Sequence, residues 1–182
     1  MNITSLRENL LNLIKKEALS KQPVKLSSGK ESSYYIDCRL VTLSPAGSLA
    51  ITEILFDMLK DDEIDAFGGP TLGADPICGS LAAVSQQKGK PLPSFIIRKE
   101  PKAHGKGKWI EGPLKPGTIV AIFDDVATSG GSLLKAIKAV EGMGCKVARV
   151  IVLVDRGEGA KEKLVEEGHC LEAIFTKEDL GV

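Results

Sequence analysis

Hydrophobic positions along the chain recur with two spacings, which predict alternating helices and strands. Apolar residues at helical spacing fill 5–19, where Ser5 and Glu8 form a capping box, and a second helical stretch runs from Pro45 through Leu59. Further along, short continuous apolar runs predict buried strands at 64–67, 94–97, 119–123, 147–154 and 171–175, separated by helical stretches at 77–86, 132–143 and 160–167. This alternation predicts an α/β fold, with a mostly parallel sheet flanked by helices.

Two segments do not follow the alternation. Residues 24–37 contain two short β-like pieces around a turn at 27–30, so the first 40 or so residues are expected to form a small N-terminal subdomain over the edge of the sheet. Residues 99–116 are polar and glycine-rich without periodicity. No linker or repeat marks a second full domain, and we therefore expect residues 1–182 to form a single domain.

Composition and charge exclude several classes of protein. The 24 basic and 24 acidic residues cancel, which argues against a dedicated nucleic-acid binder. No apolar run approaches the roughly 18–20 residues of a membrane span, and the amphipathic N-terminus does not resemble a secretory signal. The cysteines (Cys38, Cys78, Cys145 and Cys170) are too scattered for a zinc site or a disulfide framework. We expect free thiols and a cytoplasmic protein.

An acidic pair followed by a glycine loop is the strongest chemical signal. The apolar run 119–123 ends in Asp124 and Asp125, and Thr128-Ser-Gly-Gly-Ser132 leads into a predicted helix. Glycines and a helix N-terminus make a cradle for one phosphate. The carboxylates would repel that phosphate, so the loop requires sugar hydroxyls or Mg²⁺ between them. The alternative is an ordinary helix cap and solvated turn.

A concentrated basic segment follows the strand at 94–97. Residues 98–108 carry five Lys or Arg side chains, one Glu and His104. Gly105 and Gly107 favour flexibility, which suits closure over a polyanion such as a diphosphate with exclusion of water. A solvated charged loop is the alternative interpretation.

Arg156 follows the apolar strand at 147–154. The carboxyl ends of parallel strands meet at one sheet edge, so the loops after Phe67, Phe123 and Val154 are expected to carry the chemistry together. A guanidinium at that edge can hold a carboxylate in a bidentate fork. The alternative is a strand-end Arg paired with Asp155 or Glu158.

These motifs together resemble a known family. The stretch 119–132 resembles the phosphoribosyl-diphosphate signature of type I phosphoribosyltransferases. Residues 98–105 resemble the Arg-Lys-Glu-x-Lys-x-His-Gly flap of orotate phosphoribosyltransferases, and 26–37 is similar to the hood that covers the base in that family. The resemblance implies a hood within residues 1–40 and a mobile flap at 99–116.

The resemblance also implies an activity and a set of roles. The reaction would join orotate to phosphoribosyl diphosphate, with Mg²⁺ as cofactor and no direct side-chain ligation of the metal predicted. The partners would be these two substrates and a second copy of the chain, in a homodimer with shared active sites. Arg98, Lys102 and His104 would act as catalytic residues on the diphosphate, and Lys99 would bind it. Thr128 and Arg156 would contact orotate. The ribose 5-phosphate would be bound by Asp124, Asp125, Val126, Ala127, Thr128, Ser129, Gly130, Gly131 and Ser132.

Two departures from relatives leave details open. Many relatives carry Lys where Ser27 stands, and some carry an aromatic-Lys pair in the loop that here reads Pro70-Thr-Leu-Gly73-Ala-Asp75-Pro76. Asp75 in that loop is a candidate contact for Mg²⁺ or its waters. Two other functions remain open at this point: a purine or uracil phosphoribosyltransferase, and a regulatory module that senses phosphoribosyl diphosphate and binds RNA or DNA.

Overall fold

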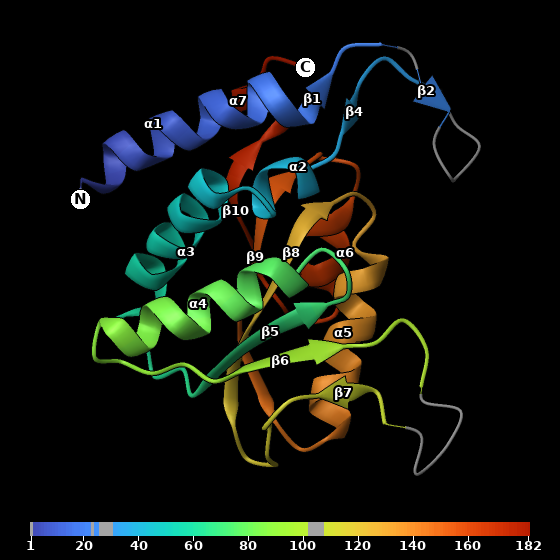
Figure 1. The fold of residues 1–182 in the computed structure, drawn as a ribbon. Coiled ribbons are helices and arrows are strands. Elements are labelled where there is room, and N and C mark those ends of the chain that lie inside the picture. Colours follow the sequence, from blue (N-terminus) through green and yellow to red (C-terminus); the bar gives the residue numbers. More distant parts are fainter. Residues whose placement is uncertain (1, 23, 26–30, 102–107) are drawn as a thin grey trace.

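A computed structural model describes residues 2–22, 24–25, 31–101 and 108–182 of the chain. The described residues form a six-stranded sheet in the order β10-β9-β8-β5-β6-β7 (Figure 1). Neighbouring strands are parallel except β7, which runs antiparallel to β6. The strands are β5 (Ala66–Pro70), β6 (Ser94–Ile97), β7 (Ile110–Glu111), β8 (Ile119–Ala127), β9 (Lys146–Asp155) and β10 (Leu171–Thr176). The predicted fold class is confirmed.

Helices cover both faces of the sheet. One face packs against α1 (Ile3–Leu13), α3 (Pro45–Leu59) and α4 (Asp75–Gln87), and the other against α5 (Gly131–Gly142) and α6 (Ala160–Glu166). Alternate residues of a strand face opposite ways, and in β8 Ala121 and Phe123 join the first core while Val120 and Ile122 join the second. Burial on both faces explains why the strands read as continuous apolar runs.

The N-terminal residues lie over one end of the sheet (Figure 1). A π-helical turn (Ile14–Ala18) continues α1, and β1 (Leu19–Ser20) then pairs antiparallel with β4 (Tyr35–Ile36). A second small ladder joins β2 (Val24–Lys25) to β3 (Glu31–Ser32), and α2 (Arg39–Thr42) leads into α3. This segment places residues 35–39 above the carboxyl ends of the strands, where they line the main cavity.

Several predicted boundaries were wrong. The first helix begins at Ile3, because Asn2 caps it by accepting the Thr4 N–H at 2.9 Å, rather than at the Ser5 capping box. The strand expected at 64–67 is β5, which includes the Gly68-Gly69-Pro70 segment expected as loop. The strand expected to end at Phe123 continues to Ala127, because Val126 and Ala127 pair with Val154 and Asp155 of β9.

Short elements were also missed. The segment 99–116 contains β7, and the chain ends in α7 (Lys177–Leu180). Cys38, Cys78 and Cys145 are buried free thiols, whereas Cys170 is exposed. Among the described residues, no helix is both long and apolar enough to cross a membrane.

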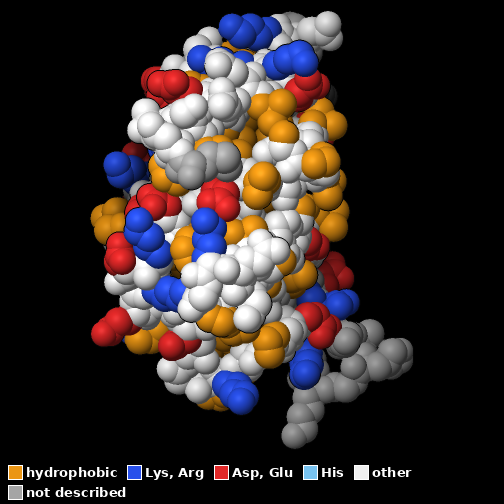
Figure 2. Space-filling view, turned by 60° about the vertical axis from the view of Figure 1, so that its left-hand side comes forward, with side chains coloured by type: hydrophobic (Ala, Val, Ile, Leu, Met, Phe, Trp, Pro, Cys, Tyr) orange, Lys and Arg blue, Asp and Glu red, His pale blue; other side chains and the backbone are white. Residues whose placement is uncertain are grey.

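Hydrophobic side chains also reach the surface beside the N-terminal segment. Leu40, Leu43, Leu49 and Leu72 are each about half or more exposed, and we call this group the leucine patch. Figure 2, which brings forward the side of the molecule on which α3 and α4 lie in Figure 1, shows hydrophobic side chains gathered in a band. Exposed apolar side chains that gather in one contiguous patch are typical of interaction surfaces.

Candidate functional site

A cavity of about 780 Å³ lies where the sheet changes winding direction, between β5 and β8. From this point the chain builds the sheet outward through β6 on one side and through β9 and β10 on the other, and such switch points leave a crevice at the strand ends. All three expected loops reach the cavity, together with the N-terminal segment and Lys99. The lining from the loops comprises Thr71, Leu72, Gly73, Asp124, Asp125, Val126, Thr128, Ser129, Arg156 and Glu158.

Asp124 is a buried carboxylate at the edge of this cavity. Its Oδ1 accepts the backbone N–H of Asp125 at 2.9 Å, and its Oδ2 accepts the Ser132 hydroxyl at 3.1 Å. Burial, and next the charge of Asp125, raise the pKa of Asp124 to about 7. Burial also raises the pKa of Asp125. Two adjacent buried acids repel each other when both are ionised. Such a pair favours a ligand whose hydroxyl groups donate hydrogen bonds to the carboxylates.

The raised pKa of Asp124 predicts how stability depends on pH. The folded chain holds this proton up to pH 7, whereas an unfolded Asp releases it near pH 4, so the contribution of Asp124 to folding falls as pH rises between these values. Asp124→Asn removes the free-energy cost of ionising this buried carboxylate. We expect urea unfolding to give the variant an advantage on the order of 1–3 kcal/mol at pH 8, shrinking toward pH 5.

An exposed carboxylate gives the matched control for this pH series. Asp61→Asn changes the same groups at a surface position and is expected to show no such trend. A native chain that gained stability relative to Asp124→Asn between pH 5 and pH 8 would contradict the pKa assignment.

The N-terminus of α5 is open toward a ligand. Gly130 precedes the helix in a left-handed conformation (φ +74°), no side chain in the described part of the chain caps the helix, and its first turn carries no acid. The first N–H groups of a helix lack partners within it and attract anions. The Ser132 hydroxyl donates to Asp124 in this structure, so backbone N–H groups and the Thr128 and Ser129 hydroxyls are the donors left for a phosphate.

Gly73 lies directly against the acidic pair. A Cβ at this position would come closer than 3.0 Å to carboxylate oxygens of both Asp124 and Asp125. The loop after β5 therefore approaches the carboxylates with bare backbone, and the aromatic-Lys pair of some relatives has no side-chain counterpart at Gly73. Next to it, the Thr71 hydroxyl donates to Asp75 Oδ2 at 2.7 Å.

Arg156 reaches the same cavity from the end of β9. Its backbone N–H donates to the Ala127 carbonyl at 3.0 Å, which fixes it beside the acidic loop. The guanidinium is buried, lies 4.8 Å from the centroid of the Tyr34 ring, and approaches a Glu158 carboxylate oxygen at 2.9 Å. The pairing with Glu158, weighed above as the structural alternative, is therefore present. It also shows that a carboxylate can reach this guanidinium.

The structure separates the predicted basic residues. Lys99 lines the main cavity. Arg98 lines a neighbouring hollow of about 380 Å³, shared with Thr71, Lys99 and Ser132, and forms an ion pair with Glu111 at 3.3 Å. Lys102 and His104 lie outside the described residues. Ala127, Gly130 and Gly131 lie at the junction of β8 and α5 and are not among the residues that line the cavity.

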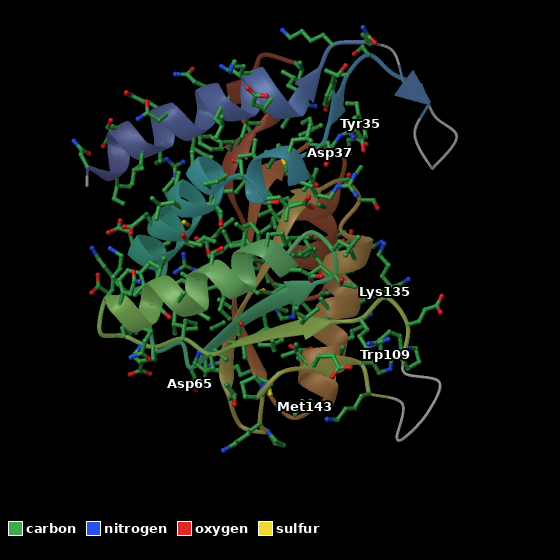
Figure 3. All side chains as sticks on the ribbon, viewed as in Figure 1. Tyr35, Asp37, Asp65, Trp109, Lys135 and Met143 are labelled. Atoms are coloured by element: carbon green, nitrogen blue, oxygen red, sulfur yellow. The ribbon has the colours of Figure 1, made fainter. Side chains whose placement is uncertain are left out.

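Other side chains of the site were not predicted. Asp37, Cys38 and Arg39 line the cavity opposite the acidic loop, and Arg39 holds Asp37 with a 2.8 Å contact. Figure 3 shows Tyr35 and Asp37 on the N-terminal segment above the strand ends. One sequence feature could have indicated these residues. Asp37 and Arg39 lie close to the adjacent tyrosines Tyr34 and Tyr35, in a segment that does not follow the α/β alternation.

The donor set fits a divalent cation that arrives with its substrate. Among the described residues, no group of three or more His, Cys, Asp or Glu side chains converges to hold a metal by itself. The buried Oδ1 of Asp75 has no hydrogen-bond partner in the described part of the chain. Mg²⁺ commonly binds through one or two carboxylates together with substrate phosphates, and Asp75 lies behind the cavity wall, hydrogen-bonded to Thr71, which lines the cavity.

Comparisons with known proteins agree with this geometry. A family model described as "Phosphoribosyl transferase domain" matches residues 41–178. The chain is 45% identical over 177 residues to the orotate phosphoribosyltransferase of Aquifex aeolicus, covering 96% of this chain and 97% of that protein. It superposes on Mycobacterium tuberculosis H37Rv orotate phosphoribosyltransferase in complex with Fe(III) dicitrate with a TM-score of 0.86 at 35% identity, covering 97% of this chain and 99% of that one. The same enzyme in complex with phosphoribosyl diphosphate gives a TM-score of 0.82 at 32% identity, with 97% and 99% covered.

Proposed function

The chain belongs to the orotate phosphoribosyltransferases of the phosphoribosyl transferase domain family, and from this premise we propose how its residues carry out the reaction. The enzyme is a glycosyltransferase that transfers ribose 5-phosphate from phosphoribosyl diphosphate to orotate. The products are orotidine 5′-monophosphate and diphosphate, in pyrimidine biosynthesis. The observation that carries the residue assignment is the convergence of the acidic pair, the open N-terminus of α5 and Arg156 around one cavity.

Each part of the cavity matches one part of the substrates. Asp124 and Asp125 accept hydrogen bonds from the ribose hydroxyls, and the 128–132 loop binds the 5-phosphate at the helix N-terminus. Arg156 pairs with the orotate carboxylate, with Thr128 beside the base. The bond from C1 to the diphosphate oxygen breaks, its electron pair leaves with the diphosphate, and orotate N1 forms the new bond to C1 after losing its proton.

The developing negative charge on the leaving diphosphate requires cations. Arg98, Lys99, Lys102 and His104 are the side chains assigned to it, Lys102 and His104 through the family resemblance alone. When bound, Mg²⁺ would neutralise part of this charge, with Asp75 as the candidate contact for the ion or its waters. Exclusion of water by the basic segment would protect the activated sugar from hydrolysis.

A base-selectivity assay tests the proposed function. The protein is mixed with phosphoribosyl diphosphate and Mg²⁺, and consumption of orotate, uracil, guanine, adenine and xanthine is followed separately. Turnover of orotate alone, lost on chelating the metal, is the expected result, because neutral bases offer no carboxylate to Arg156. Turnover of a neutral base would contradict the role of Arg156 in binding a carboxylate of the base, but it would leave the assignment of Asp124–Ser132 to the ribose 5-phosphate unchanged. Lack of turnover with every base would favour a regulatory role.

The leucine patch supports a homodimer with shared active sites. Leu72 belongs both to this patch and to the lining of the cavity, and Tyr35, which also lines the cavity, is 38% exposed. A second copy covering these side chains would bury apolar area at the mouth of the active site, which favours association. The buried free thiols of Cys38, Cys78 and Cys145 support a reducing compartment such as the cytoplasm.

Mixing two inactive variants tests the shared site. Asp124→Asn with Asp125→Asn disables the ribose site of its own chain, and Lys102→Ala disables the basic segment that would serve the neighbour. Random exchange of subunits gives hybrids with one intact site, so we expect recovery of about a quarter of native activity. The absence of recovery, with exchange proven by native mass spectrometry, would place Lys102 in the site of its own chain.

A further inference from the structure

A second hollow of about 780 Å³ lies between β7 and the C-terminal half of α5. None of its described lining residues lines the active-site cavity, although Trp109 and Lys135 also line the hollow beside Arg98. Its apolar surface comes from Trp109, Ile110, Leu114, Ala139 and Met143, of which Ile110, Ala139 and Met143 also pack against the core beneath. Figure 3 shows Trp109 next to β7 and facing α5, with Lys135 in that helix and Met143 directly after its end.

The charge of this groove is of one sign. Lys108, Lys135 and Lys138 line it, and the described lining residues include no acid. The nearest acids in sequence are engaged elsewhere, since Glu111 pairs with Arg98 and Glu141 lies 3.4 Å from His169. Lys138 contacts Glu167 at 3.2 Å, but both side chains are largely exposed and such a pair is weak. An anion therefore complements the rim.

Gly142 keeps one wall of the groove bare. It lies in α5 with ordinary helical backbone, and a Cβ there would meet nothing within 4 Å. Neither packing nor a left-handed conformation requires glycine at this position, although glycine is a poor helix residue. Gly142 lines the same groove as the exposed indole of Trp109, so a large side chain at 142 would take up space in the groove.

We propose that this groove is a second ligand site that binds a nucleoside monophosphate. The planar base would stack on the Trp109 indole over the apolar floor, and the phosphate would lie among Lys108, Lys135 and Lys138. The volume falls within the usual range of small-molecule sites, which combine a mostly apolar lining with a few polar groups. Bare phosphate would leave the apolar floor unused, and an uncharged base would leave the lysines unpaired.

Trp109 provides the signal for a direct test, because it is the one tryptophan of the sequence. The active site is first saturated with phosphoribosyl diphosphate, which carries no base to stack on Trp109, and uridine 5′-monophosphate and adenosine 5′-monophosphate are then titrated separately. We expect saturable quenching of the Trp109 emission by at least one of them, and calorimetry to give one additional nucleotide per chain. Uridine, which lacks the phosphate, is expected to bind at least about tenfold more weakly.

Two substitutions at one position separate this site from the active site. Gly142→Phe fills the groove and is expected to abolish the additional binding while orotate turnover stays at the native level. Gly142→Ala, the matched control, leaves the groove open and is expected to bind as the native chain does. The combination Lys135→Gln with Lys138→Gln is expected to weaken binding about tenfold.

The proposal is overturned if neither nucleotide gives saturable quenching. It is also overturned if a folded, active Gly142→Phe variant binds the additional nucleotide as tightly as the native chain. Neither result would bear on the base-selectivity assay, because Gly142 lines neither the active-site cavity nor the hollow beside Arg98.

Discussion

The double variant Asp124→Asn with Asp125→Asn is expected to lose about three orders of magnitude or more in kcat/KM for phosphoribosyl diphosphate. The amides keep the size of the carboxylates but replace their negative charge at the ribose and at the developing positive charge on C1. The two acids lie side by side at the end of β8, and burial raises the pKa of both. A cavity that maintains such a costly pair is specialised for a ligand.

The stability of the same variant separates catalysis from folding. Removing buried charge is expected to stabilise the unliganded chain at pH 8, so a loss of activity cannot be attributed to unfolding. Steady-state kinetics and urea unfolding on one preparation give both quantities. Activity within about tenfold of the native value would show that the pair does not act on the substrate.

Arg156→Leu is expected to raise the KM for orotate by about a hundredfold or more, because a buried guanidinium that pairs with a substrate carboxylate is lost. Affinity for phosphoribosyl diphosphate is expected to stay near the native value, since the 128–132 loop, which we propose binds the phosphate, does not depend on this side chain. Arg156→Lys keeps the positive charge but lacks the bidentate fork, and its KM for orotate is expected to lie between those of the native chain and Arg156→Leu.

Glu158→Gln provides the control for Arg156. It removes the carboxylate that approaches the guanidinium at 2.9 Å but retains the guanidinium itself, and it is expected to keep orotate binding. If Arg156→Leu left the KM for orotate unchanged, the contacts of Arg156 with Tyr34 and Glu158 would be purely structural.

Local pattern was sufficient to predict the layers of the fold and the loops that carry the chemistry. The strands at 94–97 and 147–154 were readable because burial on both faces makes them continuously apolar. The convergence of the three loops followed from the rule that parallel strands end at one edge, and the cavity lies there. The individual roles assigned to the site residues remain predictions.

Contacts between distant segments explain what the sequence could not show. Gly68 and Gly69 read as a loop, but they form part of β5 because they pair with neighbouring strands. These strands approach so closely that a Cβ at either glycine would collide with the carbonyl of Phe95 or Phe123. The stacking of Tyr34 on Arg156 joins the N-terminal segment to the end of β9. No spacing of residues along the sequence predicts either contact, and no local sequence pattern predicts the groove beside Trp109.

A crystal structure of the chain with orotidine 5′-monophosphate tests the central claim most directly, since one ligand carries all three recognised groups. The account predicts the phosphate at the N-terminus of α5, the ribose hydroxyls on Asp124 and Asp125, and the base carboxylate on Arg156. A nucleotide bound with its carboxylate away from Arg156, or with its phosphate outside the 128–132 loop, would contradict it.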